Sequence, residues 1–168
     1  MPDKANMISS AAGKLCSAAI DKLASSGISR AQAERAGLYS VASAHEDLNP
    51  EFAKLPALVI PYHDQSGKPV FFDRNGERLP FVRVRYLAEP VAKGFVRKKP
   101  QRYAQLRASG TFAYFAPCVD WRSIAADTSE PVVIVEGELK ALKACIEGIP
   151  TIGLGGVDNF RSQRGGGA

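Results

Sequence analysis

The sequence has no apolar run long enough to cross a membrane. Its most apolar segments, Ala57–Ile60 and Val132–Val135, fall far short of the ~20 residues that a membrane-spanning helix needs. The first six residues include Asp3 and Lys4 and are followed by small and polar residues rather than by the apolar stretch of a secretory signal. We therefore expect no transmembrane segment, no membrane partner and a location in the cytoplasm.

Cysteine and histidine are scarce. The chain has 3 cysteines at wide spacings, no C-x-x-C pair and 2 histidines, a pattern that supports neither a disulfide framework nor a zinc site. No period of a collagen or a coiled coil is present either. What remains is a chain of 168 residues, 45% hydrophobic and 23% charged, with 15 glycines and 11 prolines. Such a composition predicts one compact domain or two small ones, with many turns and a mixed α/β layout.

The N-terminal part has the spacing of two short helices. Apolar residues recur at helical intervals over residues 10–26, and a second helix is expected over Arg30–Ala36, where Ser29 and Gln32 have the spacing of a capping box. The second helix is too short, and has too few polar residues, for the recognition helix of a DNA-binding helix-turn-helix. We interpret residues 1–50 as a helical docking element.

The middle of the chain, residues 51–127, has the texture of antiparallel β-structure. Ala57–Tyr62 and Pro69–Phe72 flank a turn at Asp64–Gly67 and are expected to form a hairpin. A further strand is expected at Thr111–Phe115. Residues 88–110 contain Pro90, Gly94 and Pro100 and no sustained period, so a long cationic loop is expected there. His63 is interpreted as a surface histidine and Trp121 as a core residue.

The strand expected at Phe81–Leu87 alternates in character. One face would carry Phe81, Arg83, Arg85 and Leu87, and the other Val82, Val84 and Tyr86. The first face is therefore expected to be basic and the second to belong to the core.

Positive charge is concentrated in one segment. Between Arg83 and Arg107 there are eight basic residues against Glu89 alone, while the whole chain has a formal charge of +5. Lysine and arginine that neutralise phosphates release counterions and give affinity for nucleic acid. The basic residues expected to bind nucleic acid are those of this segment and one on a later helix, namely Arg83, Arg85, Lys93, Arg97, Lys98, Lys99, Arg102, Arg107 and Lys140.

Aromatic residues are interleaved with these charges. Such rings can stack single-stranded bases, which suggests single-stranded DNA or RNA as the partner. The alternative is that the rings belong to the core and that the charges form a solvated face. The aromatic residues in question are Tyr86, Phe95, Tyr103, Phe112 and Tyr114.

The C-terminal part, residues 128–168, has a different pattern. Pro131–Val135 reads as a strand buried on both faces of a parallel sheet, followed by an amphipathic helix that Gly148 ends and by a second strand at Ile149–Leu154. A strand, a crossover helix and a parallel strand form a βαβ unit. The fold class expected is therefore α+β, with an N-terminal helical element, an antiparallel β-rich middle and an incomplete parallel βαβ unit at the C-terminus.

Glu136 is the most informative single residue. It follows an apolar strand and precedes a glycine that opens a helix, and ligands of parallel sheets bind beyond the carboxyl ends of the strands. Glu138 would add a second carboxylate, although acidic residues in a first helical turn also serve simply as favourable helix ends. The glycines at Gly153, Gly155 and Gly156 match no phosphate-loop motif, and a tight turn explains them equally well.

Two segments together resemble a known family. Residues 132–142, VVIVEGELKAL, and residues 148–159, GIPTIGLGGVDN, look like the opening βαβ of a Toprim domain, and more narrowly like the module of primase-type replication proteins of phages, plasmids and other mobile elements. The resemblance implies that Glu136 acts as general acid or base, that Glu136 and a later Asp-x-Asp pair bind Mg²⁺, and that the chain takes part in phosphotransfer on nucleic acid. It also implies a replicative helicase, or a C-terminal remainder, as a partner.

The sequence departs from that family after Phe160, where no further apolar strand and no Asp-x-Asp pair follow. Because Mg²⁺ takes several oxygen ligands, Glu136 and Glu138 alone do not complete a two-metal site. We therefore expect the N-terminal part of a primase-type protein that binds single-stranded nucleic acid beside a partial Toprim site and has no full activity. Two alternatives stay open: a non-catalytic nucleic-acid-binding or adaptor module, and a relative of the Toprim-type nucleases.

Overall fold

The computed structural model describes residues 14–88 and 101–155. These residues form two compact units. Unit 1 comprises the chain up to Tyr62 together with Pro69–Ser109, and unit 2 comprises His63–Lys68 and the chain from Gly110 onward. Both helices and strands are present, so the α+β class predicted from the sequence is confirmed.

Unit 1 contains three short helices and six strands among its described residues. In chain order they are α2 (Ser17–Ala24), α3 (Arg30–Arg35), β1 (Tyr39–Val41), α4 (Ala44–Asp47), β2 (Ala57–Pro61), β3 (Phe71–Arg74), β4 (Glu77–Pro80), β5 (Val82–Tyr86) and β6 (Tyr103–Ala104).

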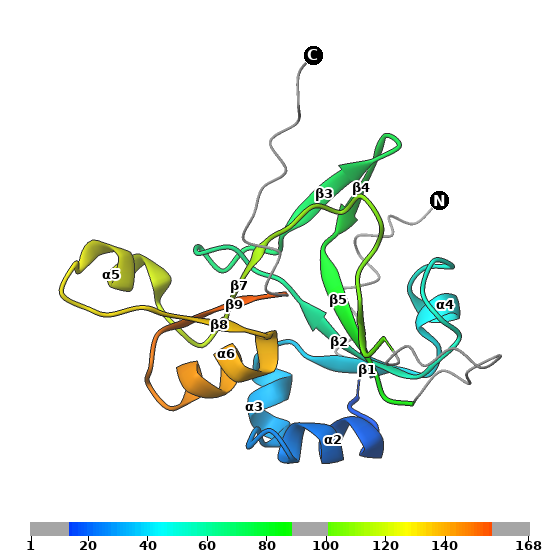
Figure 1. Ribbon diagram of the computed structural model, residues 1–168, viewed down its shortest axis with the longest axis horizontal. Coiled ribbons are helices and arrows are strands. Elements are labelled where there is room, and N and C mark those ends of the chain that lie inside the picture. Colours follow the sequence, from blue (N-terminus) through cyan, green and yellow to red (C-terminus); the bar gives the residue numbers. More distant parts are fainter. Residues whose placement is uncertain (1–13, 89–100, 156–168) are drawn as a thin grey trace. The chain divides into compact units, whose positions relative to one another are not determined.

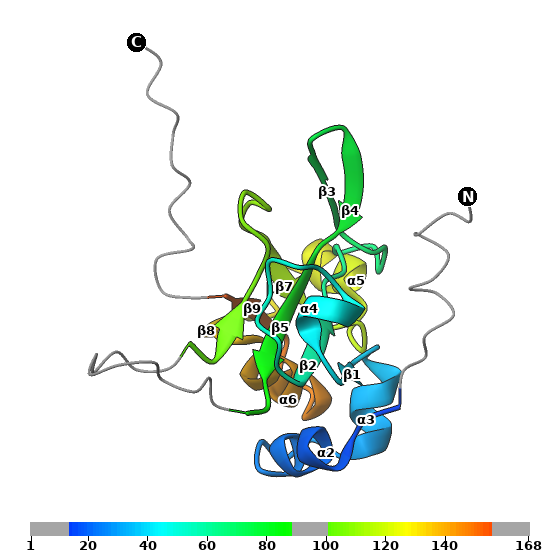
Figure 2. The same cartoon turned by 90° about the vertical axis from the view of Figure 1, so that its right-hand side faces the viewer.

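The centre of unit 1 is a four-stranded antiparallel sheet in the order β1-β2-β5-β6. Strands β3 and β4 form a separate two-stranded hairpin, which projects beyond β5 in both Figure 1 and Figure 2. Its turn is Asn75-Gly76, and both residues have positive φ angles, 51° and 78°, as a tight hairpin turn requires. The sheet, rather than the hairpin, supplies the buried core of this unit, because β2 is apolar along its length and fully covered from Ala57 to Ile60.

The two helices expected near the N-terminus are present. Helix α3 begins with the predicted capping box: the Gln32 backbone N–H donates to Ser29 Oγ at 3.3 Å, and the Ser29 N–H donates to Gln32 Oε1 at 2.8 Å. Leu23 of α2 and Ala33 of α3 are fully buried, as is Ile28 between them. Since the chain continues from α3 into β1, which pairs with β2, these helices belong to the same unit as the sheet.

Two predictions for the middle of the chain are met only in part. The segments 57–62 and 69–72 pair only beside the turn, where the Val70 N–H donates to the Tyr62 carbonyl at 2.9 Å, because β2 itself pairs with β1 and β5 while β3 pairs with β4. The turn between them does form: Asp64 Oδ1 accepts the N–H groups of Ser66 and Lys68 at 2.7 and 3.0 Å. The expected long loop over residues 88–110 is also shortened at its end, because β6 adds to the edge of β5.

Unit 2 contains three strands and two helices among its described residues. They are β7 (Ala113–Phe115), α5 (Trp121–Ala126), β8 (Val133–Glu136), α6 (Glu138–Ile146) and β9 (Thr151–Leu154). The strand order is β7-β9-β8, with β8 parallel to β9 and β7 antiparallel to it. The predicted parallel βαβ unit is therefore present as β8, α6 and β9. The third strand of the sheet, β7, precedes this unit in the sequence and pairs with β9.

Helix α6 packs directly on β9. Gly153 lies within β9, inside the strand expected at Ile149–Leu154, so a tight turn does not explain this glycine. A Cβ atom added there would lie 3.1 Å from the Ala141 Cβ, 3.3 Å from the Tyr114 Cβ and 3.4 Å from the Glu138 Cα. A glycine at this position thus permits the close approach of helix and sheet.

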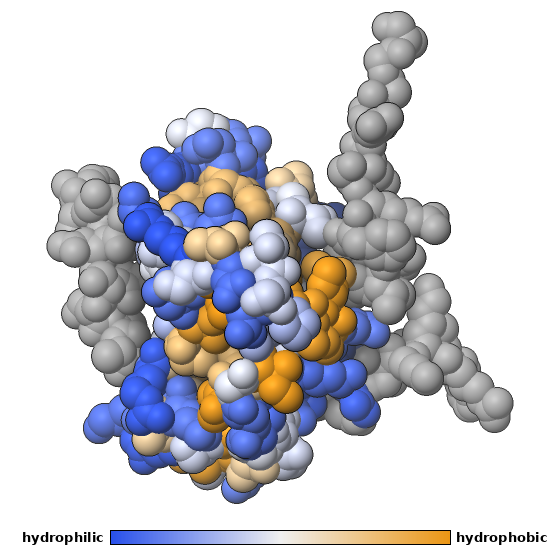
Figure 3. All heavy atoms as spheres, turned by 90° about the vertical axis from the view of Figure 1, so that its left-hand side faces the viewer, coloured by the Kyte–Doolittle hydropathy of each residue, from blue (hydrophilic) through white to orange (hydrophobic). Residues whose placement is uncertain are grey.

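The apolar strand β8 is not buried on both faces, which corrects the sequence-based expectation. It is an edge strand, and Val132, Val133 and Ile134 are 41%, 42% and 65% exposed. Figure 3 shows hydrophobic surface on one face of the molecule among hydrophilic residues. An apolar β-branched run is typical of a strand that is covered on both faces. In this structure α6 packs against one face of β8, and β9 pairs with one of its two edges.

The division into units differs from the boundaries expected at residues 50 and 127. Pairing across those boundaries explains the difference, because β1 joins β2 and β7 joins β9. Within the described ranges, no helix has the length and apolar character that a bilayer span requires.

Candidate nucleic-acid interface

The pairing of β5 with β6 brings together part of the basic segment. Arg85 lies directly opposite Tyr103 in the antiparallel ladder. The guanidinium groups of Arg83 and Arg85, two residues apart on the same strand, lie 5.4 and 5.7 Å from the centre of the Tyr103 ring. These distances are within the range of cation–π attraction. Tyr103 is half-buried and so keeps part of its surface accessible.

Arg83 does not lie on a solvated basic face, contrary to the expectation from alternation. It is only 9% exposed, and Phe81 on the same face is 2% exposed. Strand β5 is paired on both edges and covered on both faces. The alternation of charged and apolar residues therefore distinguishes two covered faces, rather than one face in contact with solvent and one in the core. The contact of Arg83 with the Tyr103 ring makes it a residue that positions the ring.

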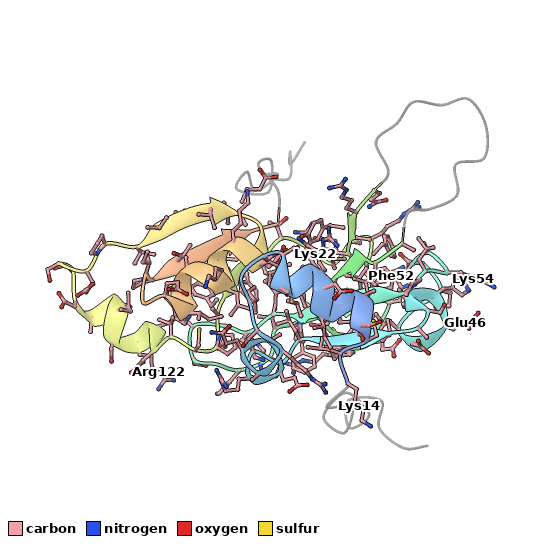
Figure 4. The ribbon with its side chains drawn as sticks, turned by 90° about the horizontal axis from the view of Figure 1, so that it is seen from below. Lys14, Lys22, Glu46, Phe52, Lys54 and Arg122 are labelled. Carbon is pink, nitrogen blue, oxygen red and sulfur yellow. The ribbon has the colours of Figure 1, made fainter. Side chains whose placement is uncertain are left out.

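Lys22 joins this group from a different element. It is the basic residue in the last turn of α2, where Figure 4 labels it. Burial lowers the pKa of Lys22 below its ordinary value, and the nearby positive charges of Arg85 and Arg102 lower it further. Arg102 is held beside the end of β5 by a 2.9 Å hydrogen bond from the Tyr86 N–H to its carbonyl oxygen.

We call Lys22, Arg85 and Arg102 the basic cluster. None of the three forms an ion pair with any residue that the structure describes. The Lys22 ammonium donates to two neutral oxygens, Ser25 Oγ at 3.3 Å and Ser26 Oγ at 3.1 Å, which leave its charge uncompensated. Arg85 Nε is buried and has no hydrogen-bond partner among the described residues.

The remaining predicted contacts do not join this cluster. Arg107 is exposed, but its backbone N–H donates to Glu51 Oε2 at 3.4 Å, and Glu51 is paired with Arg74. The hydrogen bond from Arg74 lowers the pKa of Glu51, so this carboxylate stays negative beside Arg107. Lys140 is exposed on α6, in unit 2. The other predicted basic residues, Lys93, Arg97, Lys98 and Lys99, lie outside the described residues.

Two of the five interleaved aromatic residues are core residues. Tyr114 is fully buried, and Tyr86 is 8% exposed with its hydroxyl oxygen accepting the Ala53 N–H at 2.9 Å. Phe112 is half-buried in unit 2, and Phe95 lies outside the described residues. Within the described part of unit 1, Tyr103 is therefore the aromatic residue of this group that is partly accessible beside Arg83 and Arg85. Trp121 is 6% exposed, as predicted for a core residue.

Glu136 occupies the place expected for it. It is exposed at the carboxyl end of β8, paired in register with Leu154 of β9. Gly137 follows with a φ of 99° and donates its N–H to the Leu154 carbonyl at 2.8 Å, which redirects the chain into α6. The backbone thus presents Glu136 at the edge where ligands of parallel sheets bind.

Glu138, the second predicted catalytic residue, is placed differently. It is 1% exposed, and its Cα lies against β9 at Gly153. The structure therefore separates the two carboxylates into an exposed one and a buried one. Sequence spacing could not show this, because Glu136 ends β8 and Glu138 begins α6, so the turn of the chain at Gly137 sets their relative orientation.

The described residues do not assemble a magnesium site. Among residues 14–88 and 101–155, no group of three or more histidine, cysteine, aspartate or glutamate side chains stands close enough to hold a metal ion. Glu136 contributes a single carboxylate, whereas Mg²⁺ takes a near-octahedral set of oxygen ligands. The described donors do not fit the ion, and no reaction step is derived from it.

His63 is half-buried rather than on the surface as expected. Its burial lowers the pKa of the imidazole, and the carboxylate of the neighbouring Asp64 opposes that effect. Its Nδ1 atom is buried without a hydrogen-bond partner among the described residues.

Comparison with known proteins gives one match. The family described as "Domain of unknown function (DUF3854)" matches residues 120–167, which include α5 and the βαβ unit. No curated protein and no solved structure matches the chain. The match coincides with the segment that resembles the Toprim family, and its description assigns no function.

Proposed function

We propose that this chain binds single-stranded nucleic acid through the basic cluster and Tyr103, as the nucleic-acid-binding part of a primase-type replication protein. The observation that carries the proposal is the pairing of β5 with β6, which places Arg85 against the Tyr103 ring and Arg102 beside the end of β5, with no described carboxylate partner for either arginine. The lowered pKa of Lys22, to which the positive charges of Arg85 and Arg102 contribute, supports its place beside them. We expect such a protein to act in the cytoplasm.

The basic cluster carries positive charge that no described carboxylate compensates. Cations held near one another repel, and the repulsion is relieved when an anion binds beside them. The Nε atom of Arg85 is buried without a hydrogen-bond partner among the described residues, so part of this charge is shielded from water. A phosphate group beside the guanidinium would compensate the charge. These features favour a polyanion over a neutral ligand.

Tyr103 supports single-stranded rather than double-stranded nucleic acid. An aromatic side chain can stack only on a base that is not already stacked in a duplex, and such stacking is worth about 1 to 3 kcal/mol per base. Arg83 and Arg85 hold the ring beside the charges that would bind the backbone. A base and its phosphate could therefore be bound side by side.

Unit 2 supports the wider assignment to a primase-type protein. Its strand, helix and parallel strand form a βαβ unit, as the resemblance to Toprim domains implies, with Glu136 exposed at the carboxyl end of β8. We propose a role in acid–base chemistry for Glu136 in the whole protein, where further ligands would have to complete a metal site. For the described residues, binding is the function that the geometry favours.

The proposal is tested by fluorescence anisotropy with a labelled oligothymidylate that has no terminal phosphate. Arg85→Ala combined with Arg102→Ala should weaken binding by about tenfold or more at low salt, because two charged contacts with a backbone phosphate are lost. The matched control removes two exposed cations outside the cluster, Lys54 and Arg122, which Figure 4 labels. Equal losses in the two double variants would show that only net charge matters, and the proposed interface would be rejected.

A further inference from the structure

The basic cluster contains more charge than an internal phosphodiester requires. A phosphodiester has one negative charge, whereas a terminal phosphate monoester has about −1.5 to −2 at pH 7 and three acceptor oxygens. Lys22, Arg85 and Arg102 together offer three positive charges. The charge of a phosphate monoester balances these three charges better than the charge of a phosphodiester does.

The three cations come from three different segments of unit 1. Lys22 lies on the last turn of α2, Arg85 lies on β5 opposite Tyr103, and Arg102 directly precedes β6. A row of charges along one strand would follow a phosphate backbone residue by residue. Charges that converge from separate elements suit a single, compact anion.

The available donors also suit one phosphate with several oxygens. An ammonium group has three N–H donors, and Lys22 uses two of them on Ser25 and Ser26. One remains. Neither Arg85 nor Arg102 forms an ion pair with a described residue, and arginine has five donors in a planar fork that matches phosphate.

We propose that the basic cluster is a binding site for the terminal phosphate monoester of a nucleic-acid strand, with Tyr103 beside it to stack the terminal base. This inference rests on the proposed function and adds to it a preference for a phosphorylated strand end. Arg102 and Lys22 are the residues that set the preference, and Arg83 positions the ring.

The test compares three forms of one internally labelled oligothymidylate: with a 5′-phosphate, with a 3′-phosphate and with no terminal phosphate. Fluorescence anisotropy with the full chain should give about tenfold tighter binding for one phosphorylated form than for the unphosphorylated form, which corresponds to about 1.4 kcal/mol. The two phosphorylated arms identify which end of the strand is bound.

Two variants and one control connect the preference to the cluster. Arg102→Gln changes an exposed residue and should reduce the preference to about twofold or less, because one charged contact with the monoester is lost. Lys22→Gln should do the same. Lys54→Gln, an exposed cation in the same unit outside the cluster, should leave the preference at its original value. Circular dichroism of each variant verifies the fold.

The outcomes separate the two proposals. If all three oligonucleotides bind equally well, the terminal-phosphate site is wrong and the proposed function stands. If the chain binds none of them at low salt, the proposed function itself is wrong. A preference that survives both Arg102→Gln and Lys22→Gln would place the phosphate elsewhere and would also overturn the inference.

Discussion

Gly153 offers a quantitative test of how unit 2 is packed. Alanine at this position would put its methyl group 3.1 Å from the Ala141 Cβ and 3.3 Å from the Tyr114 Cβ. Neither atom is the end of a long side chain, since each Cβ is fixed to its backbone. Relief of these contacts therefore requires α6 or β7 to shift away from β9.

The expected magnitude follows from two opposing contributions. Overpacking of a well-filled core costs about 1 to 3 kcal/mol. Replacing glycine by alanine also restricts the unfolded chain, which stabilises the fold by about 0.4 to 1 kcal/mol. Gly153→Ala should therefore lower the free energy of unfolding of unit 2 by about 1.3 kcal/mol, the difference between the midpoints of the two ranges, and by no more than about 2.6 kcal/mol.

Urea denaturation followed by tryptophan fluorescence measures this loss in the right part of the molecule. Trp121 is the only tryptophan of the chain, lies in unit 2, and donates its Nε1–H to the Ala116 carbonyl at 2.9 Å. Its emission should change at a lower urea concentration in the variant. An unchanged or higher midpoint would refute the close packing of α6 on β9.

A second substitution identifies the contact responsible. Ala141→Gly alone should cost about 1 kcal/mol, the usual price of glycine within a helix. Combined with Gly153→Ala, it removes the methyl group at 3.1 Å, so the double variant should lose less stability than the two single variants together, by at least about 0.5 kcal/mol. Strict additivity would mean that the two positions are not in contact.

Two further predictions concern charge and exposure. Because its pKa is lowered, Lys22 loses its proton at a lower pH than an ordinary lysine, and the affinity for nucleic acid should fall as the pH rises through that pKa. Lys22→Arg should move this fall in affinity to higher pH. Identical pH profiles for the variant and the original protein would exclude a contact through Lys22. Ile134 is 65% exposed on β8 and Leu142 is 1% exposed on α6. Ile134→Ser should change stability by about 0.5 kcal/mol or less, whereas Leu142→Ala should cost about 2 to 5 kcal/mol; comparable losses in urea denaturation would show that β8 is covered after all.

Local signals in the sequence predicted local structure well. The capping box of Ser29 and Gln32 starts α3, and Gly148 ends α6 with a φ of 84°. The parallel pairing of β8 and β9 also followed from the pattern of an apolar strand, an amphipathic helix and a second apolar strand. These features depend on residues near one another in the chain, so a single sequence contains the information.

Pairing between distant segments could not be predicted in the same way. The three residues of β1 and the two residues of β6 are too short to produce a period, and their strands exist because β2 and β5 offer an edge. The exposure of β8 likewise depends on its place at the edge of a sheet rather than on its composition.

The same distinction applies to the candidate site. Arg85 and Arg102 belong to the segment that charge clustering singled out, and Glu136 lies at the strand end that its position predicted. The burial of Arg83 and the participation of Lys22 depend on tertiary packing. Lys22 lies more than sixty residues before Arg85 in the chain, and nothing in its local sequence distinguishes it from a solvated helical lysine.

The most direct test of the proposed interface is the salt dependence of binding to unphosphorylated oligothymidylate. Each phosphate neutralised on a single strand contributes about −0.7 to the slope of log affinity against log salt concentration. Because both arginines are proposed to contact one phosphate, the variant with Arg85→Ala and Arg102→Ala should have a slope less negative than that of the original protein by about 0.7. The Lys54→Ala and Arg122→Ala control should keep the original slope. If the cluster variant keeps the original slope as well, Arg85 and Arg102 do not contact the backbone, and nucleic-acid binding by the basic cluster is contradicted.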